Sequence, residues 1–280
     1  MTSVSSSQRI HATATVHPRA EIHPTAEVGP GCAIGEHVRI GASTKLYPNV
    51  VVDGWTEIGA ENLIYPGVAI GLEPQDLKYR GAPSRVEIGD RNCLRECVTI
   101  NRATEEGEVT RLGNDNLLMA YTHVAHNCDI GDRVIMANSV ALAGHIRIES
   151  QARISGLVGV HQFTHIGKLA MVGGMARIDR DVPPYMMVEG NPGRIRGLNL
   201  VGLKRAGLRS SDPEFKQLKE AYRLLYRSRR KLEDVLQELA TWPSEGEYVA
   251  ELLRFLKSSI GDRDRRGPLP SRDTDKKGEA

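Results

Sequence analysis

An aliphatic residue recurs at six-residue intervals over most of this chain as far as residue 178, with two interruptions. The register runs from Ile10 to Ile70, returns from Ile88 to Ile100, and continues from Leu112 to Ile178. Neither an α-helix nor a flat strand has a period of six, whereas a coil of short strands joined by corners does. Glycine often follows the aliphatic residue, as at Gly29 and Gly89, where we expect it to relieve a strained corner. The repeat therefore predicts a solenoid with the aliphatic side chains inside.

This hexapeptide pattern resembles the left-handed parallel β-helix of bacterial acyltransferases. The resemblance implies that three hexapeptides form one triangular coil, and that stacked coils bury a continuous core. Two segments, 71–87 and 101–111, break the pattern but keep its register, so we expect loops that leave an unbroken stack of coils. Loops on a rigid scaffold often carry binding and catalytic residues.

The composition changes after the repeat, and the sequence predicts three regions. Residues 1–190 are expected to form the β-helix, 191–260 a smaller α-helical C-terminal domain, and 261–280, which is polar and charged, a disordered tail. Helix starts are predicted at 211–214, where a capping side chain precedes a proline, and at 244–247, which matches a capping box.

Composition and charge exclude several classes of protein. The 280 residues are 40% hydrophobic with a formal net charge of +2, unlike a chain disordered throughout. No run approaches the ~20 apolar residues of a membrane span, and the near-neutral balance argues against a general nucleic-acid binder. The N-terminus lacks the apolar stretch of a secretory signal, and four cysteines do not make a disulfide framework in this length. We therefore expect a cytoplasmic protein with reduced thiols.

Five of the nine histidines are concentrated on the later coils: His123, His126, His145, His161 and His165. With three hexapeptides to a coil, residue n lies beside residue n+18, which places His126 beside Gly144 and diagonally next to His145. A neutral imidazole can accept a proton near neutral pH. A glycine N–H that faces the same space can stabilise an oxyanion. This pairing suits acyl transfer to a hydroxyl group.

Two functions of other classes remain open at this point. The histidines and Cys128 are possible zinc ligands, as in hexapeptide-repeat carbonic anhydrases, but no His-x-His or tight Cys/His pair is present, so no metal site is predicted. A non-catalytic scaffold is the other alternative. An ice-binding surface of that kind would need regular exposed threonine ladders, which this chain lacks.

Seven short segments make the resemblance specific to the UDP-N-acetylglucosamine O-acyltransferase family, which begins lipid A biosynthesis. They occur in this order: Gln75–Tyr79, Asp115–Met119, His123–His126, Leu142–His145, His161–Phe163, Asp181–Tyr185 and Gly202–Arg205. The resemblance as a whole covers nearly the whole chain to about residue 260. Generic hexapeptide acetyltransferases share the repeat but not this combination.

The resemblance implies a role for each matching residue. His126 is the expected general base toward the sugar 3-hydroxyl, and the Gly144 N–H is expected to bind the tetrahedral oxyanion. The expected substrate-binding residues are Asp76 and Lys78 for sugar and phosphate, His123, His145, His161 and Gln162 for the sugar nucleotide and acyl chain, Gly174 for acyl length, and Asn199 and Arg205 for the nucleotide of a neighbouring subunit.

The implied reaction moves a 3-hydroxyacyl chain from acyl-carrier protein to UDP-N-acetylglucosamine. No cofactor is implied, because the phosphopantetheine of the carrier delivers the acyl group, and the family implies a homotrimer. Basic residues at helical spacing are a candidate docking face for the acidic carrier: Lys216, Lys219, Arg223, Arg227 and Arg230.

Four positions depart from the family pattern, namely Asn101, Asn127, Pro192 and Val201. Asn127 follows the expected base where aspartate is common. Asparagine can accept a hydrogen bond from an imidazole N–H, but it supplies no negative charge to an imidazolium. The departures leave open a UDP 2,3-diamino sugar, acylated on nitrogen, as the acceptor. Within the same fold, the other alternative is a related N-acyltransferase that acts on a UDP-3-O-acyl-glucosamine.

Overall fold

The computed structural model describes residues 9–242 and 246–271. The chain divides into two compact units, Met1–His145 and Ile146–Ala280, and each is described by itself.

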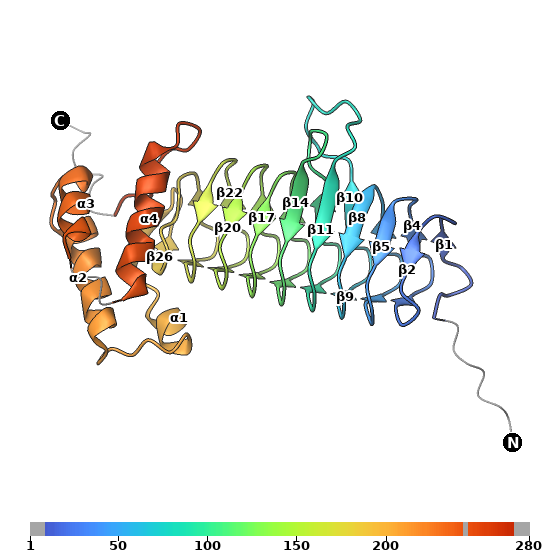
Figure 1. Cartoon of the computed structure of the whole chain (residues 1–280), viewed down its shortest axis with the longest axis horizontal. Coiled ribbons are helices and arrows are strands. Elements are labelled where there is room, and N and C mark those ends of the chain that lie inside the picture. Colours follow the sequence, from blue (N-terminus) through green and yellow to red (C-terminus); the bar gives the residue numbers. More distant parts are fainter. Residues whose placement is uncertain (1–8, 243–245, 272–280) are drawn as a thin grey trace, which may run out of the picture. The chain divides into compact units, whose positions relative to one another are not determined.

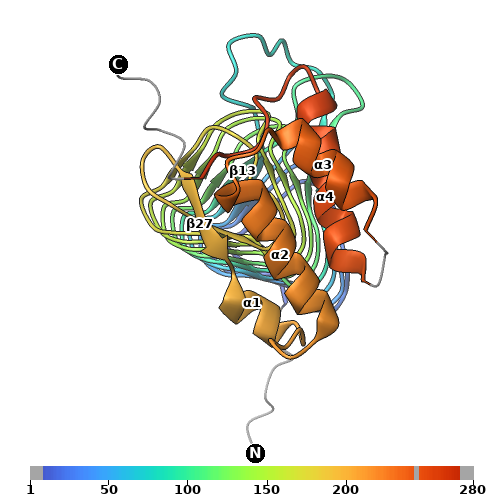
Figure 2. The same cartoon turned by 90° about the vertical axis from the view of Figure 1, so that its left-hand side faces the viewer.

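The first unit is a three-sided coil of short parallel strands (Figures 1 and 2). One sheet contains β1 (Thr15–Val16), β4 (Ala33–Ile34), β7 (Val51–Val52), β10 (Ala69–Leu72), β13 (Thr99–Asn101), β16 (His123–Val124) and β19 (Ala141–Leu142). A second contains β2 (Glu21–Ile22), β5 (Val38–Ile40), β8 (Trp55–Ile58), β11 (Arg85–Ile88), β14 (Val109–Leu112) and β17 (Asp129–Ile130). The third contains β3 (Glu27–Val28), β6 (Lys45–Leu46), β9 (Leu63–Ile64), β12 (Cys93–Leu94), β15 (Leu117–Leu118) and β18 (Ile135–Met136).

The aliphatic residues of the repeat fill the interior of the coil, as predicted. Ile64, Leu94 and Leu118, which occupy successive strands of the third sheet, are fully buried. Burying such a side chain contributes about 1.5–3 kcal/mol relative to leaving it exposed. The fold class predicted from the sequence, a left-handed parallel β-helix followed by a smaller helical region, is confirmed.

Glycine is needed after the aliphatic residues for a different reason from the one that the sequence analysis expected. Gly29 and Gly89 do not have the left-handed backbone that strains other residues. A Cβ atom on Gly29 would instead lie 2.9 Å from the carbonyl oxygen of Leu46, and one on Gly89 would lie 2.8 Å from that of Gly113. These glycines are therefore required by the close approach of the next coil.

Both predicted loops leave the coil, and the register of the coils continues after them, with a local shift at Leu72 where the first loop begins. Unbroken coils pair residues 18 positions apart, as Thr15 with Ala33. Ala69 pairs with Thr99, 30 positions on, and Thr99 pairs with His123, 24 positions on. The first loop therefore adds 12 residues, between β10 and β11, and the second adds 6, between β13 and β14.

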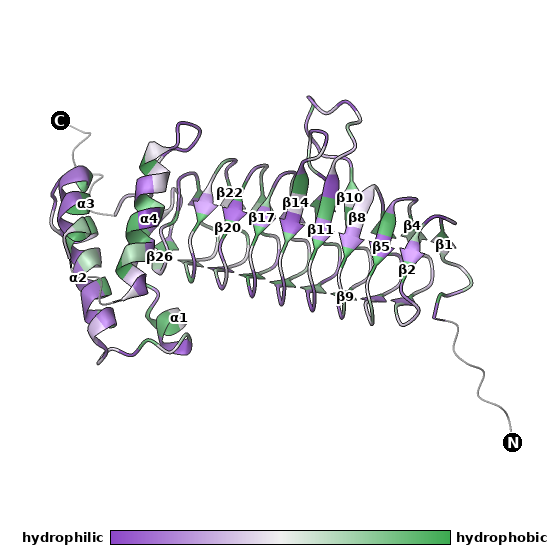
Figure 3. Ribbon diagram, viewed as in Figure 1, coloured by the Kyte–Doolittle hydropathy of each residue, from purple (hydrophilic) through white to green (hydrophobic). Residues whose placement is uncertain are grey.

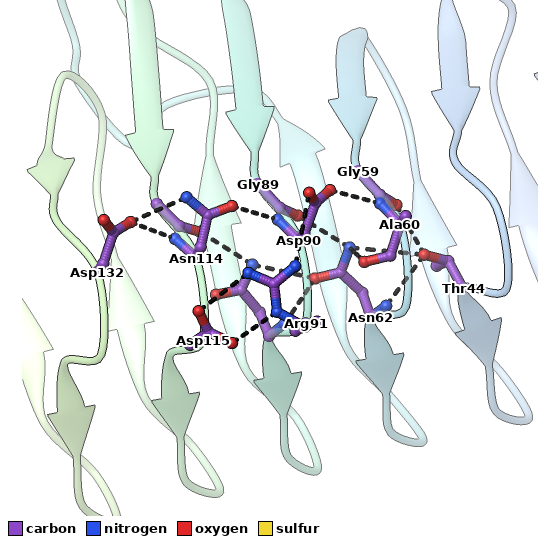
Figure 4. Close-up of polar contacts among 12 residues, drawn as sticks. Thr44, Gly59, Ala60, Asn62, Gly89, Asp90, Arg91, Asn114, Asp115 and Asp132 are labelled. Carbon is purple, nitrogen blue, oxygen red and sulfur yellow. Dashed lines mark hydrogen bonds and ion pairs between the residues drawn. The ribbon is translucent and has the colours of Figure 1, made fainter.

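A ladder of buried polar side chains connects neighbouring coils (Figure 4). The Oδ1 atom of Asn62 accepts hydrogen bonds from the backbone N–H of Asn92 at 2.9 Å and from its Nδ2 at 3.0 Å. Asn92 Oδ1 accepts from the Asn116 N–H at 2.9 Å, and Asn92 Nδ2 donates to the Gly113 carbonyl at 3.0 Å. The side chains thus satisfy backbone groups that burial would otherwise leave unpaired.

The second unit contains further short parallel strands and the helices. Three pairs repeat the coil pattern: β20 (Arg147–Ile148) with β23 (His165–Ile166), β21 (Arg153–Ile154) with β24 (Met171–Val172), and β22 (Gly159–Val160) with β25 (Arg177–Ile178). Then β26 (Met186–Glu189) joins β24 in parallel and β27 (Arg194–Leu198) antiparallel. The described helices are α1 (Leu200–Arg205), α2 (Pro213–Arg227), α3 (Leu232–Ala240) and α4 (Glu247–Gly261).

Helices α2 and α4 are amphipathic, as Figure 3 shows. Helix α2 begins at Pro213, at the predicted start, and helix α4 begins at Glu247, although Ser244 of the predicted capping box lies outside the described residues. No described helix is long and apolar enough to span a membrane.

Part of the predicted disordered tail is tied to the second unit. The Leu269 N–H donates to the Asp181 carbonyl at 2.8 Å, and Ser271 forms a bridge with Ile195. The Arg265 guanidinium lies 2.6 Å from the buried carboxylate of Asp181. The rest of that tail, 272–280, lies outside the described residues.

Candidate active site

His126 lies at the corner after β16, and Gly144 lies at the corresponding corner after β19. The register pairs His123 with Ala141 and Val124 with Leu142, so the stacking predicted for His126 and Gly144 is confirmed. A Cβ atom on residue 144 would lie 2.5 Å from His126 Nε2, which leaves no room for a side chain. The imidazole therefore lies directly against the Gly144 backbone.

The backbone N–H of Gly144 is available as a hydrogen-bond donor. The next residue, His145, uses its N–H within the coil and donates to the His126 carbonyl at 3.0 Å. The Gly144 N–H has no acceptor among residues 9–242 and 246–271, although the residue is buried. An unused N–H beside an imidazole is the donor that a developing oxyanion needs.

The two ring nitrogens of His126 have different neighbours. Nδ1 lies 2.9 Å from Oδ1 of Asn127, within hydrogen-bond distance. Nε2 lies 3.8 Å from Oδ2 of Asp76, beyond hydrogen-bond distance but close enough for an ion pair with a protonated ring. Only 14% of the His126 side chain is exposed, so charge on the ring is poorly screened by water. The arrangement leaves Nε2 as the nitrogen that can take a proton from a substrate.

Asp76 comes from the first loop, as the sequence predicted, and Lys78 lies two residues further along. Asp76 Oδ1 accepts a hydrogen bond from the Lys78 N–H at 2.9 Å, which fixes the turn, while the Lys78 side chain is exposed. The carboxylate thus faces His126, and the ammonium is free to meet a solvated anion.

Arg102 holds the first loop in place, a role that the sequence analysis missed. Its guanidinium donates to the Gly71 carbonyl at 2.9 Å, to Glu73 Oε1 at 3.1 Å and to the Tyr79 hydroxyl at 3.0 Å. The neighbouring Asn101 donates from Nδ2 to the Glu73 carbonyl at 2.8 Å. The sequence does not indicate these contacts, because Arg102, Asn101 and the residues that they bind lie where the two loops interrupt the hexapeptide repeat.

The second loop supports Asn127, another contact that the sequence did not indicate. The N–H and hydroxyl of Thr104 contact Asn127 Oδ1 at 3.2 and 3.0 Å, and Asn127 Nδ2 donates to Glu108 Oε2 at 2.7 Å. Burial opposes ionisation of Glu108. Hydrogen bonds from Asn127, the Glu105 N–H and Thr104 outweigh burial and hold the pKa of Glu108 below its ordinary value.

Two further histidines surround His126. The His145 ring meets the His126 ring edge to face with centroids 5.2 Å apart, and Nδ1 of His123 lies 2.7 Å from the Thr99 hydroxyl. Burial first, and then the His126 charge, lower the pKa of both His123 and His145 below its ordinary value of about 6.5. Both are therefore neutral at neutral pH and do not repel a proton arriving at His126.

The remaining predicted site residues belong to the second unit. His161 and Gln162 are exposed, and His161 Nε2 lies 3.3 Å from the Arg266 guanidinium. Gly174 is an exposed corner residue, where an added Cβ atom would make an ordinary 3.5 Å contact with the Gly156 carbonyl.

Asn199 and Arg205 lie at opposite ends of α1. Asn199 Oδ1 accepts from the Gly202 N–H at 2.9 Å, and its Nδ2 donates to the Leu169 carbonyl at 2.8 Å. The Asn199 side chain is thus a buried helix cap with both of its polar atoms paired. Arg205 is exposed in the last turn of the helix.

The described residues offer no cluster of three or more histidine, cysteine, aspartate or glutamate side chains that could hold a metal ion. The cysteines are free thiols, two of them buried and two half-buried.

Comparison with known proteins gives one consistent result. Residues 181–268 match the family model described as UDP N-acetylglucosamine O-acyltransferase, domain 2. A relative from Gloeothece citriformis is 62% identical over 224 residues, 80% of each chain, and is named acyl-(acyl-carrier-protein)–UDP-N-acetylglucosamine O-acyltransferase. A relative of the same name from Verminephrobacter eiseniae is 46% identical over 75% of this chain and 80% of its own.

Solved structures agree with the sequence relatives. The UDP-N-acetylglucosamine acyltransferase of Francisella novicida superposes with a TM-score of 0.89 at 38% identity, over 94% of this chain and 95% of its own. The Arabidopsis enzyme of that name superposes with a TM-score of 0.82 at 36% identity, over 93% of this chain and 99% of its own.

Proposed function

This chain belongs to the acyl-(acyl-carrier-protein)–UDP-N-acetylglucosamine O-acyltransferase family, and from that premise we propose that His126 and Gly144 perform the acyl transfer. The enzyme catalyses the first step of lipid A biosynthesis. Its substrates in this proposal are a 3-hydroxyacyl chain on acyl-carrier protein and the 3-hydroxyl of UDP-N-acetylglucosamine. The observation that carries the assignment is the imidazole packed against the backbone of a glycine whose N–H is unused.

The reaction begins with proton transfer to His126. Nε2 removes the proton of the sugar 3-hydroxyl as that oxygen attacks the carbonyl carbon of the acyl thioester. A C–O bond forms, and the carbonyl π-electrons move to the oxygen of a tetrahedral intermediate. The Gly144 N–H donates to that oxyanion. Asp76, 3.8 Å from Nε2, favours the imidazolium while the intermediate exists.

The intermediate collapses with loss of the carrier thiol. The C–S bond breaks, the carbonyl re-forms, and the imidazolium of His126 returns its proton to the departing sulfur. The products are the 3-O-acyl sugar nucleotide and free phosphopantetheine on the carrier. Every step uses groups of the chain and the two substrates, so the proposed mechanism includes no metal or bound cofactor.

The other residues of the proposal bind the substrates. Asp76 and Lys78 hold the sugar and phosphate, and His123 and His145, which are neutral at neutral pH, hydrogen-bond the sugar nucleotide. In the second unit, the family resemblance assigns substrate contacts to these residues: His161, Gln162, Gly174, Asn199 and Arg205. Because Asn199 caps α1 with both side-chain polar atoms, we assign the nucleotide contact to the exposed Arg205 and the placement of its helix to Asn199.

The proposal includes partners beyond the sugar nucleotide. The enzyme acts as a homotrimer in the cytoplasm, and acyl-carrier protein docks on the basic face of α2. Lys216, Lys219 and Arg223 are exposed there, which supports docking of an acidic carrier.

An acyl-transfer assay tests the proposed function. Purified enzyme receives 3-hydroxyacyl carrier proteins of several lengths, with UDP-N-acetylglucosamine or its 3-amino analogue as acceptor, and mass spectrometry identifies the product. We expect an ester on the 3-hydroxyl, and a loss of at least ~100-fold in kcat for His126→Ala, the typical contribution of a general base.

The two acceptors separate the related reactions. An amide formed only with the amino sugar would keep the base and change the acceptor, and so overturn the proposed O-acylation. Full activity in a folded His126→Ala variant would overturn the assignment of the base.

A further inference from the structure

We propose that Glu108 is a positioning residue for His126 and acts through the amide of Asn127. The inference rests on the proposed function, because it assumes that His126 is the general base. Glu108 lies at the end of the second loop and contacts Asn127, which directly follows His126 and faces its Nδ1 atom. Asp76 of the first loop lies on the other side of the ring, near Nε2.

The contacts between Glu108 and Asn127 leave no choice of donor and acceptor. The ionised carboxylate of Glu108 can only accept, so the group of Asn127 that faces it at 2.7 Å must be the NH₂. The amide oxygen therefore lies on the opposite side, where the Thr104 N–H, which can only donate, approaches to 3.2 Å. Both neighbours fix the same orientation of the amide.

This orientation in turn fixes the tautomer of His126. Asn127 Oδ1 can only accept, and it lies 2.9 Å from His126 Nδ1, so Nδ1 must carry the hydrogen. A neutral imidazole with hydrogen on Nδ1 has its lone pair on Nε2, next to Gly144 and toward Asp76. Glu108 thereby selects the tautomer that can remove a proton from the acceptor.

Glu108 also replaces the charge that asparagine lacks. The carboxylate lies one amide group beyond the imidazole, and hydrogen bonds from Asn127, Thr104 and the Glu105 N–H hold it in the ionised form. A negative charge at that place stabilises the imidazolium formed during transfer. The departure of Asn127 from the family pattern is thus compensated by a carboxylate from the second loop.

The titratable groups around His126 are few enough to separate by experiment. Asp76 faces it from the first loop, Glu108 from the second, His123 from β16 and His145 from the next coil. Of these, His123 and His145 are neutral near neutral pH, so Asp76 and Glu108 are the charges that act on the ring.

Two variants separate orientation from charge. Glu108→Gln can still accept from Asn127 Nδ2 through its amide oxygen but carries no charge, and Glu108→Ala removes both. We expect kcat to fall about 10-fold for Glu108→Gln and about 100-fold for Glu108→Ala, below the 10⁴-fold typical of a triad acid in direct contact with its histidine. The KM for UDP-N-acetylglucosamine is expected to stay within about 2-fold, because the lost interaction belongs to the transition state.

The pH profile gives a readout that a merely structural role would not change. Without the carboxylate the imidazolium is less stable, so the acid limb of kcat/KM is expected to move to lower pH in Glu108→Gln. Adding Asn127→Asp to Glu108→Gln places a carboxylate directly on Nδ1, and we expect this double variant to recover most of the lost kcat. Glu106→Gln, an exposed carboxylate of the same loop, is the control for net charge.

Each outcome decides the question. Inactive His126→Ala combined with wild-type kcat and pH profile in a folded Glu108→Gln would overturn this inference and leave the proposed function intact. Active His126→Ala would overturn the proposed function itself. If Glu108→Ala lowers the thermal midpoint, the conclusion is drawn from Glu108→Gln, which keeps the shape of the side chain. If Glu108→Gln lowers kcat but the Glu108→Gln/Asn127→Asp double variant does not recover it, Glu108 does not act through Asn127.

Discussion

Gly144 defines the candidate site at the scale of a single residue. Its hydrogen occupies a place where a methyl group would contact three atoms of the His126 ring. The residue has no left-handed backbone that would by itself require glycine. Glycine is required at this position because the His126 ring occupies the space that a side chain of residue 144 would fill.

We therefore expect Gly144→Ala, which keeps the backbone N–H, to displace the imidazole and to lower kcat by about 100-fold, a typical effect of losing a general base. Thermal unfolding should change little, because the atoms that the added methyl group would meet belong to the His126 side chain and not to the backbone of the coil. Gly197→Ala, where an added Cβ atom meets nothing within 4 Å, is the matched control in the acyl-transfer assay. Wild-type kcat in Gly144→Ala would contradict the inference that the missing side chain at residue 144 places the imidazole of the base.

At the scale of structural elements, the polar ladder links successive coils of the first unit. Asn62 of one coil binds Asn92 of the next, and Asn92 binds Asn116 of the one after (Figure 4 shows the Asn62 end). Asn62 and Asn92 are fully buried, so each side chain replaces water for backbone groups of its neighbours.

Replacing Asn92 by alanine removes the partner of the buried Asn116 N–H and of the half-buried Gly113 carbonyl. We expect the free energy of unfolding to fall by about 3 kcal/mol, since each unpaired buried group costs about 1–3 kcal/mol. Denaturant titration measures this value. Asn138→Ala, at an exposed asparagine, is the control, and equal stability of the two variants would show that the ladder contributes nothing.

At the scale of the whole molecule, the basic face of α2 is the part of the proposal that concerns a macromolecular partner. Its lysines are exposed, whereas Arg223 contacts Glu220 at 3.1 Å. Arg230, which the sequence analysis placed on the same helical face, lies beyond the end of α2 at Arg227 and is paired with Glu238. Lys216 and Lys219 are therefore the cations best placed to attract an acidic carrier.

The double variant Lys216→Glu/Lys219→Glu is expected to raise the KM for acyl-carrier protein about 10-fold, an effect that weakens as added salt screens the charges. The KM for UDP-N-acetylglucosamine should not change. Lys257→Glu, an exposed lysine of α4, controls for the change in net charge. If both KM values respond equally, the face does not act by binding the carrier.

The six-residue period made both the coil and the central pair of the site predictable from sequence. The stacking of His126 beside Gly144 follows from the period together with the three-hexapeptide coil that the resemblance implied, because no loop lies between the two residues. Asn62, Asn92 and Asn116 also occupy equivalent positions, but the loops change their separation to 30 and 24 residues and conceal the ladder. The contacts of Arg102 and Glu108 could not be predicted, because they depend on loop conformations that follow no repeat.

The lengths of the two insertions have a consequence for how such a chain can change over time. Because the loops add 12 and 6 residues, every residue after them keeps its orientation toward the inside or the outside. An insertion of a single residue that the corners did not absorb would turn the following aliphatic side chains toward solvent. The two loops thus lengthen the chain without repacking the core, and the coils act as a scaffold on which loop sequence can vary while the aliphatic interior stays the same.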